Sequence, residues 1–193
     1  GLVSGLGLGV GLWGYLSGLG VSSSAVVSPI VATMSAVFPY AYAIARGADA
    51  TGWSLVGALV ALVGLILVSF GGGPIANIAA GVRWSVISGF GYGFGLSIIM
   101  EASESSGAWP AVTQRVAALG LMVMVASRNG TGFALLGVRA AGIAAGIFAA
   151  ASTIFYLLGV QADATPAVVT ASMFPAVTVI VGRLAYRDSV SGV

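Results

Sequence analysis

The sequence predicts an all-α, polytopic transmembrane helix bundle of about seven spans, and three observations support that prediction. The chain of 193 residues is 59% hydrophobic and only 6% charged, whereas soluble domains contain about 25% charged residues. The apolar residues come in blocks of the length that crosses a bilayer, about 20 residues. The blocks lack the period-two alternation of barrel strands, and a helix satisfies every backbone hydrogen bond in lipid.

Each apolar block ends at turn residues or charges, which sets the expected boundaries. The second block closes at Arg46 and Asp49, and the fourth closes at Glu101 and Glu104. The fifth opens at Trp109, followed by Pro110, because proline suits the first turn of a helix. The expected spans are residues 2–19, 25–45, 51–70, 84–100, 109–126, 133–160 and 164–186.

Glycine is unusually frequent inside these spans. Residues four apart share a helix face, and glycine there lets two helix backbones approach closely. We therefore expect a tightly packed bundle, although glycine is also simply common in spanning helices. The pairs with this spacing are Gly5/Gly9, Gly7/Gly11, Gly14/Gly18, Gly89/Gly93, Gly91/Gly95 and Gly142/Gly146.

The composition excludes several classes of function. The chain has no cysteine and no histidine, which removes disulfides, thiol nucleophiles, iron–sulfur ligands and most zinc sites. The basic residues are scattered and the formal charge is only +2, so the chain has no nucleic-acid footprint. We expect no cofactor and no metal. An enzyme is disfavoured, because the sequence offers no nucleophile and base pair.

Two segments of the chain look alike. Each has a small or valine-rich entry, a Phe-Pro in mid-helix and a polar exit with Arg and Asp. The copies begin an odd number of spans apart, which would make them cross the bilayer in opposite directions; the alternative is a chance match. The first copy contains residues 25–29, Phe38-Pro39 and 46–49, and the second contains residues 166–169, Phe174-Pro175 and Arg183 to Asp188.

The same residues resemble the EamA domain of the drug/metabolite transporter (DMT) superfamily. The similar motifs are Val26-Val27-Ser28-Pro29-Ile30 with Pro39, the Gly57/Gly64 pair, and the run from Ser172 to Arg183. Members of this family have ten spans in two five-helix inverted repeats. The resemblance implies that residues 1–70 end the first repeat, 71–83 link the repeats, and 84–193 form a second repeat without its last helix. The polar exit departs from the family's Gly-Glu-Arg-Leu.

By this resemblance the chain corresponds to helices three to nine, and its first residue is not Met. We therefore expect a fragment that does not transport alone. The implied function is a secondary-active permease or exporter of a small metabolite, amino acid or drug. It would work by alternating access in the bacterial plasma (inner) membrane, with a proton or ion as a possible coupling partner. A structural or channel-like bundle is the alternative, and a membrane-embedded enzyme is a weaker one.

Arg115 is the sharpest candidate for a functional residue, with Gln114 beside it. A charge in the membrane costs about 2.5–3.5 kcal/mol, so it needs a partner or a wet cavity. Arg115 could contact a carboxylate-bearing substrate or a gating acid, or its side chain could snorkel to the headgroups. The aromatic residues could line a cavity and stack on a substrate, or anchor the helices at the membrane interface. These aromatic candidates are Trp13, Tyr15, Tyr92 and Tyr156, with Tyr40 and Tyr42 nearer span ends.

The remaining candidates have structural interpretations. Glu101 and Glu104 could carry a coupling proton, but a solvated loop is the simpler interpretation. The same holds for three aspartates and for prolines that shape helices. These are Asp49, Asp163 and Asp188, and Pro29, Pro39 and Pro175.

The charges are unevenly divided between the two sides of the expected topology. One side holds Glu101, Glu104, Asp163 and the Arg46/Asp49 pair, and five other arginines fall on the opposite side. The positive-inside rule puts the arginine side in the cytoplasm, whereas the family layout puts it outside. We favour the family layout, because arginines at helix ends can snorkel. The five are Arg83, Arg128, Arg139, Arg183 and Arg187.

Overall fold

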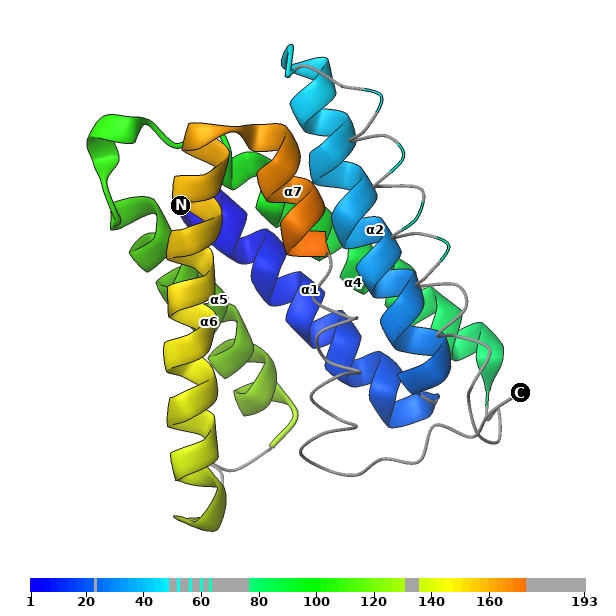
Figure 1. Ribbon diagram of the computed structural model, residues 1–193. Helices are drawn as coiled ribbons and strands as arrows, with labels where there is room; N and C mark the ends of the chain where they lie inside the picture. Colours follow the sequence, from blue (N-terminus) through cyan, green and yellow to red (C-terminus); the bar gives the residue numbers. More distant parts are fainter. Residues whose placement is uncertain are drawn as a thin grey trace.

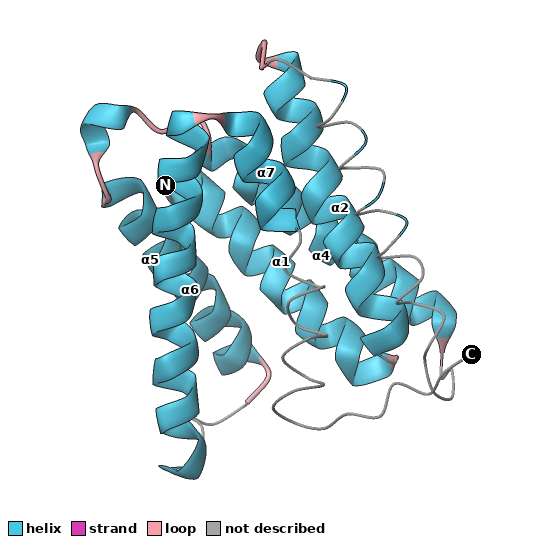
Figure 2. Ribbon diagram, viewed as in Figure 1, coloured by secondary structure: helices cyan, strands magenta, loops and turns pink. Residues whose placement is uncertain are grey.

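A computed structural model of the chain is helical throughout the part that it describes (Figures 1 and 2). The description covers residues 1–22, 24–48, 77–130 and 136–172, together with Gly52, Val56, Val60 and Val63. The elements are α1 (Leu2–Val21), α2 (Ser24–Ala45), α4 (Ile78–Ile99), η1 (Glu104–Ser106), α5 (Trp109–Arg128), α6 (Leu136–Ala162) and α7 (Ala164–Ser172).

Four of these helices, α1, α2, α5 and α6, are long and apolar enough to cross a membrane. They match the first, second, fifth and sixth expected spans to within a few residues. The expected span 51–70 lies outside the described residues except for Gly52, Val56, Val60 and Val63, which are helical. The expected span 164–186 is described only as far as Ser172.

Helix α4 differs from the expected fourth span in its start and in its composition. It begins at Ile78 instead of Trp84, because the Asn77 side chain caps it and accepts a hydrogen bond from the Ala80 N–H at 3.4 Å. It is not among the four apolar candidates, since glycine and serine occupy much of its length. Helices α1 and α2 cover it on two sides, so it needs fewer lipid-facing side chains (Figure 1).

The contact between α1 and α4 is made by glycine on both helices. A Cβ added to Gly91 would lie 2.6 Å from the Gly11 nitrogen and 2.9 Å from the Gly7 oxygen. A Cβ added to Gly95 would lie 2.8 Å from the Ser4 oxygen. These are backbone atoms, which cannot move aside as a flexible side chain can. The close packing expected from the glycine spacing is therefore confirmed for these helices.

The glycine contacts also give the helix directions. Along α1, Gly7 meets Gly95, Gly14 meets Ser88 and Gly18 meets Trp84, so α1 and α4 are antiparallel. Along α2, Met34 meets Gly89 and Phe38 meets Gly93, so α2 and α4 are parallel.

A second glycine face of α1 packs on α5. Gly5 meets Gln114 and Gly9 meets Ala118, so α1 and α5 are parallel. Figure 1 shows α6 running opposite to α5, and α7 turning back from the end of α6.

The bundle therefore has two ends, which we name the Glu101 end and the Arg128 end. The Glu101 end holds the last turns of α2, α4 and α6 and the first turns of α1, α5 and α7. The acids of the described ranges, Glu101, Glu104 and Asp163, belong to that end. Three exposed arginines belong to the other end, which confirms their common side; they are Arg83, Arg128 and Arg139.

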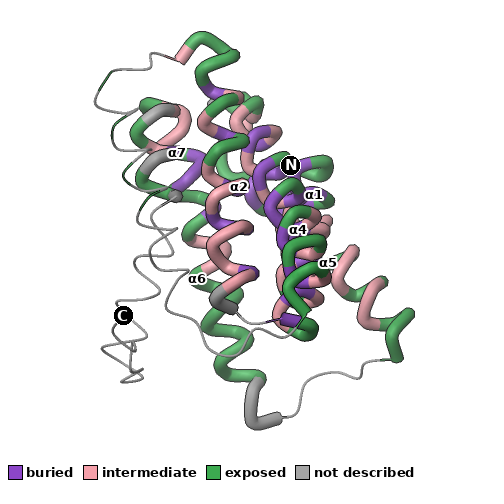
Figure 3. Tube along the Cα trace, turned by 90° about the vertical axis from the view of Figure 1, so that its right-hand side faces the viewer, coloured by how far each residue is buried: buried purple, intermediate pink, exposed green. Residues whose placement is uncertain are grey.

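Small residues fill the interior, and large apolar side chains cover the outside (Figure 3). The buried faces of α1 and α4 consist mainly of glycine and serine. On α6, in contrast, Phe148 is 76% exposed and Phe155 is 72% exposed. Water-soluble proteins bury such side chains and rarely expose extended apolar patches. The inverted arrangement is that of helices packed against each other in lipid.

The glycine pair on α6 is an exception to the predicted packing. Gly142 and Gly146 meet nothing within 4 Å among the described residues. In the described part of the chain, the close packing expected for this pair is therefore not found.

Candidate functional site

Arg115 lies in the second turn of α5 and reaches across to α6. Its Nη2 donates hydrogen bonds to the Ala149 carbonyl oxygen and to Thr153 Oγ1. Its Nε is buried and meets no hydrogen-bond partner among the described residues. The guanidinium is therefore inside the bundle at the α5–α6 contact, with part of its donor capacity unused.

Gln114 points to the opposite neighbour, α1. It is 1% exposed, and its Nε2 donates to Ser4 Oγ at 2.6 Å. Ser4 Oγ in turn donates to the Gly95 carbonyl oxygen at 2.5 Å. This relay joins α5, α1 and α4 through one polar chain. The other amide atom, Gln114 Oε1, is buried without a partner.

Tyr92 connects the Arg115 region with α1. A Cβ added to Gly11 would come within 2.6 Å of Tyr92 Cγ, so the phenol ring lies directly on the α1 backbone. Tyr92 is within electrostatic range of both Tyr15 and Arg115. The Tyr15 hydroxyl also lies 3.0 Å from Ser28 Oγ on α2. The structure thus brings Arg115, Tyr92 and Tyr15 into one neighbourhood, which we call the Arg115 cluster.

The other two aromatic candidates lie elsewhere. Trp13 packs edge-on against Trp84, with ring centroids 5.2 Å apart at an interplanar angle of 72°. Tyr156 is 9% exposed and belongs to an apolar cluster with Ile99 and Val168 towards the Glu101 end. Its hydroxyl is buried without a hydrogen-bond partner. The contacts of these two side chains are with other helices of the bundle.

The prolines were expected to shape helices. Pro29 and Pro39 both lie inside α2, which continues as helix from Ser24 to Ala45. Pro39 is fully buried, so its ring is part of the helix packing. The described residues do not include Pro175, Asp49 or Asp188.

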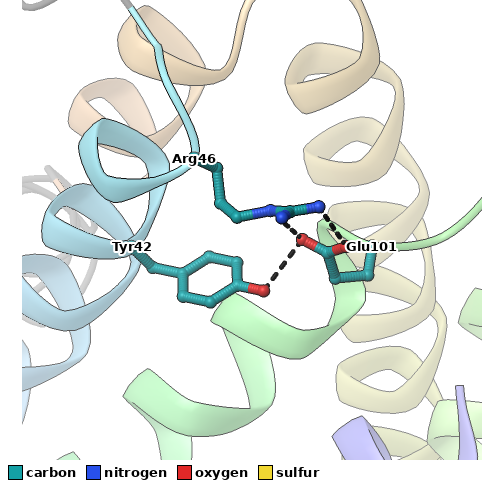
Figure 4. A network of polar contacts seen from close by, with 3 residues as sticks. All are labelled: Tyr42, Arg46 and Glu101. Carbon is teal, nitrogen blue, oxygen red and sulfur yellow. Dashed lines mark hydrogen bonds and ion pairs between the residues drawn. The ribbon is translucent and has the colours of Figure 1, made fainter.

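Glu101 has specific partners that the sequence did not indicate. Its carboxylate accepts hydrogen bonds from Arg46 and from the Tyr42 hydroxyl (Figure 4). The Tyr42 hydrogen bond is the largest cause that lowers the pKa of Glu101, followed by Arg46. A carboxyl with a lowered pKa stays ionised near neutral pH, so Glu101 is poorly suited to carry a coupling proton there.

Sequence reasoning missed the partners of the polar residues it singled out. Ser4 and Thr153 are hydroxyls inside spans, and such side chains commonly hydrogen-bond across helices. That rule could have marked both as partners for Gln114 and Arg115. Across the ranges with assigned positions, no three acidic side chains come together to hold a metal ion. No family model, curated protein or solved structure matches the chain.

Proposed function

We propose that the chain belongs to a multi-pass secondary transporter for a small solute that carries a carboxylate. The proposal takes up the resemblance to the EamA domain and the expected alternating-access mechanism. The observation that carries it is the position of Arg115. Placing a cation inside a helix bundle with an apolar outer surface costs free energy, so we expect Arg115 to have a function that offsets this cost.

The relation between α2 and α7 supports the inverted repeat. These helices contain the entries of the two sequence copies, around Val26 and Val168. Helix α2 runs towards the Glu101 end, whereas α7 starts at that end and turns away from it (Figure 1). The two helices also pack against each other. Opposite directions are what an inverted repeat requires for its two copies.

The Arg115 cluster supports the substrate class. The free Nε of Arg115 is a charged hydrogen-bond donor for a carboxylate oxygen. Tyr92 and Tyr15 bring aromatic rings into the same neighbourhood, where they can pack on an apolar side chain or ring. An amino acid or a small aromatic acid combines these two features.

Uptake into proteoliposomes that contain the full-length protein, of which this chain is expected to be a part, tests the proposal. The probes are labelled phenylalanine, tryptophan and leucine, with phenylpropionate and its neutral amide as competitors. We expect saturable uptake of at least one probe and stronger competition by the acid than by the amide. Arg115→Gln should lower uptake about tenfold or more, the loss expected for one charge-assisted hydrogen bond. Uptake of none of the probes, or equal competition by acid and amide, contradicts the proposed substrate class.

A structural role for Arg115 is the second candidate, and one observation favours it. Its Nη2 is already engaged by Ala149 and Thr153, which ties α5 to α6. In that case Arg115→Gln should lower the thermal stability of the purified protein. If it serves the substrate, the same change leaves stability nearly unaltered and lowers uptake about tenfold or more.

A further inference from the structure

Three side chains form a charged network at the Glu101 end (Figure 4). Arg46 Nε donates to Glu101 Oε1 at 2.9 Å, and Arg46 Nη2 donates to Glu101 Oε2 at 2.9 Å. The Tyr42 hydroxyl donates to Glu101 Oε1 at 2.8 Å. The arginine pairing is bidentate, the geometry that gives Arg–carboxylate pairs their directional strength. Tyr42 and Arg46 are four residues apart, so they project from the same face at the end of α2.

The network fastens two helices that come from distant parts of the chain. Arg46 and Glu101 are separated by 55 residues. Arg46 follows α2, and Glu101 follows α4. Farther from this end, the two helices touch through Phe38 on Gly93 and Met34 on Gly89, contacts without charge. The network therefore lies beyond the last glycine contact, where α2 and α4 open towards solvent.

The charge of Glu101 is unfavourable where it stands unless Arg46 is present. Glu101 follows the C-terminus of α4, and the helix dipole there disfavours an anion. Arg46 stands at the C-terminus of α2, where a cation is favoured. Pairing them across the two parallel helices offsets the unfavourable placement of Glu101.

The two ends of the α2–α4 pair are closed differently. At the Arg128 end, Gly81 of α4 meets Ser22, in the connection that leads into α2, and a Cβ added to Gly81 would lie 3.6 Å from Val26 of α2, contacts without charge. At the Glu101 end, the ion pair closes the gap, with side chains 63% exposed for Arg46 and 42% exposed for Glu101. Ion pairs so open to water are weak and are broken and remade easily. Such a contact suits a reversible closure better than a permanent one.

We propose that Tyr42, Arg46 and Glu101 form a latch that closes the Glu101 end of the bundle, and that its release lets α2 and α4 part there to admit the solute. This inference rests on the proposed transport function, in which Arg46 belongs to the first repeat and Glu101 to the second. The latch would then join the two repeats on one face of the membrane. Alternating access requires a contact of this kind that opens on one side while the other stays closed.

Cysteine accessibility tests the latch, because the chain has no cysteine of its own. Ala43, in the last turn of α2, is 2% exposed, so Ala43→Cys reports opening at the Glu101 end. The protein is labelled in membranes with an impermeant maleimide. Adding Glu101→Gln or Arg46→Gln to Ala43→Cys should raise the labelling rate roughly two- to fivefold.

Three controls distinguish a latch from general loosening. The charge swap Arg46→Glu with Glu101→Arg should return labelling towards the rate of Ala43→Cys alone. Arg128→Gln, which removes an exposed arginine at the other end, should leave it unchanged. Labelling of Ser22→Cys at the Arg128 end should not rise with Glu101→Gln. The latch is wrong if Glu101→Gln and Arg46→Gln both leave the labelling rate of Ala43→Cys unchanged. It is also wrong if the charge swap does not bring a raised labelling rate back towards that of Ala43→Cys alone.

The labelling needs no substrate, so it separates the latch from the transport proposal. Faster labelling with no uptake of any probe by the full-length protein keeps the latch as a helix closure and contradicts the proposed substrate class. Saturable uptake with unchanged labelling keeps transport and removes the latch.

Discussion

The α1–α4 contact is made by glycine and serine, whereas the α5–α6 contact depends on one long charged side chain. Glycines on α1 and α4 let the two backbones touch, with serine hydroxyls bonding across at Ser4 and Ser88. Helices α5 and α6 meet through the long side chain of Arg115, and Gly142 and Gly146 of α6 meet nothing within 4 Å among the described residues. The same glycine spacing thus gives close packing in one place and none in the other. Glycines four residues apart identify a helix face that can pack closely, but close packing also requires a neighbouring helix at that face.

The largest expected effect on stability comes from adding a methyl group to a packing glycine of α4, with Gly142 of α6 as the comparison. Gly91→Ala should destabilise the protein by about 1–3 kcal/mol, because the new Cβ meets the Gly11 nitrogen at 2.6 Å. Gly142→Ala, with nothing within 4 Å, should be neutral or stabilising by up to about 1 kcal/mol through helix propensity. Thermal unfolding in detergent measures both. Equal stabilities for the two variants would mean that the α1–α4 backbones are not in contact.

The next effect concerns the polar relay that crosses the glycine contact. Ser4→Ala removes the acceptor of the buried Gln114 amide, which should cost about 1–3 kcal/mol. In the double variant with Gln114→Leu, the buried amide that Ser4→Ala leaves without an acceptor is also removed. The double variant should therefore recover part of the lost stability. A double-mutant cycle on thermal stability measures the coupling. Strictly additive losses would show that the two side chains do not interact.

Arg115→Met should change stability less, by about 1 kcal/mol or below. It loses the hydrogen bonds to Ala149 and Thr153, but it also removes the cost of a charge among apolar helices. Thr153 keeps a partner of its own, since its hydroxyl lies 3.2 Å from the Ala149 oxygen. Chemical denaturation in mild detergent provides the measurement. A loss above about 3 kcal/mol would give Arg115 a mainly structural role.

The smallest effect is a pH dependence at the α2–α4 contact. The folded pKa of Glu101 is lowered, so its contribution is complete above the unfolded pKa of about 4.3. The contribution is lost as the pH falls through the lowered folded value. Stability should therefore be insensitive to Glu101 near pH 7 and decline with acid, less so in Glu101→Gln. Melting curves from pH 7 down to about pH 2 compare the two, and identical acid profiles would contradict the pairing.

The helices and their packing faces could be predicted because both follow from local patterns. The apolar blocks, the helix start at Pro110 and the packing glycines of α1 and α4 can each be recognised from nearby residues, without knowing which helix packs against them. Arg115 was also marked locally, since a charge inside a span is costly wherever it points.

The contacts between distant residues could not be predicted in the same way. The partners of Arg115 lie 34 and 38 residues away, and nothing in the local sequence identifies Ala149 or Thr153. Glu101 was interpreted as a solvated loop residue because its partner lies on another helix. The start of α4 was placed too late, because a pattern search that follows apolar residues passes over the cap at Asn77.

The bond between Ser4 and Gly95 has a consequence for biosynthesis. The two residues are 91 positions apart in the chain, and ribosomes add about 5–20 residues per second. A newly inserted α1 therefore waits roughly 5 to 20 s before α4 emerges to cover its glycine face. During that time its bare backbone and one hydroxyl face lipid or the insertion machinery. Helix α1 is thus completed only once α4 has been made, and a nascent chain stalled before α4 would present an unfinished surface to quality control.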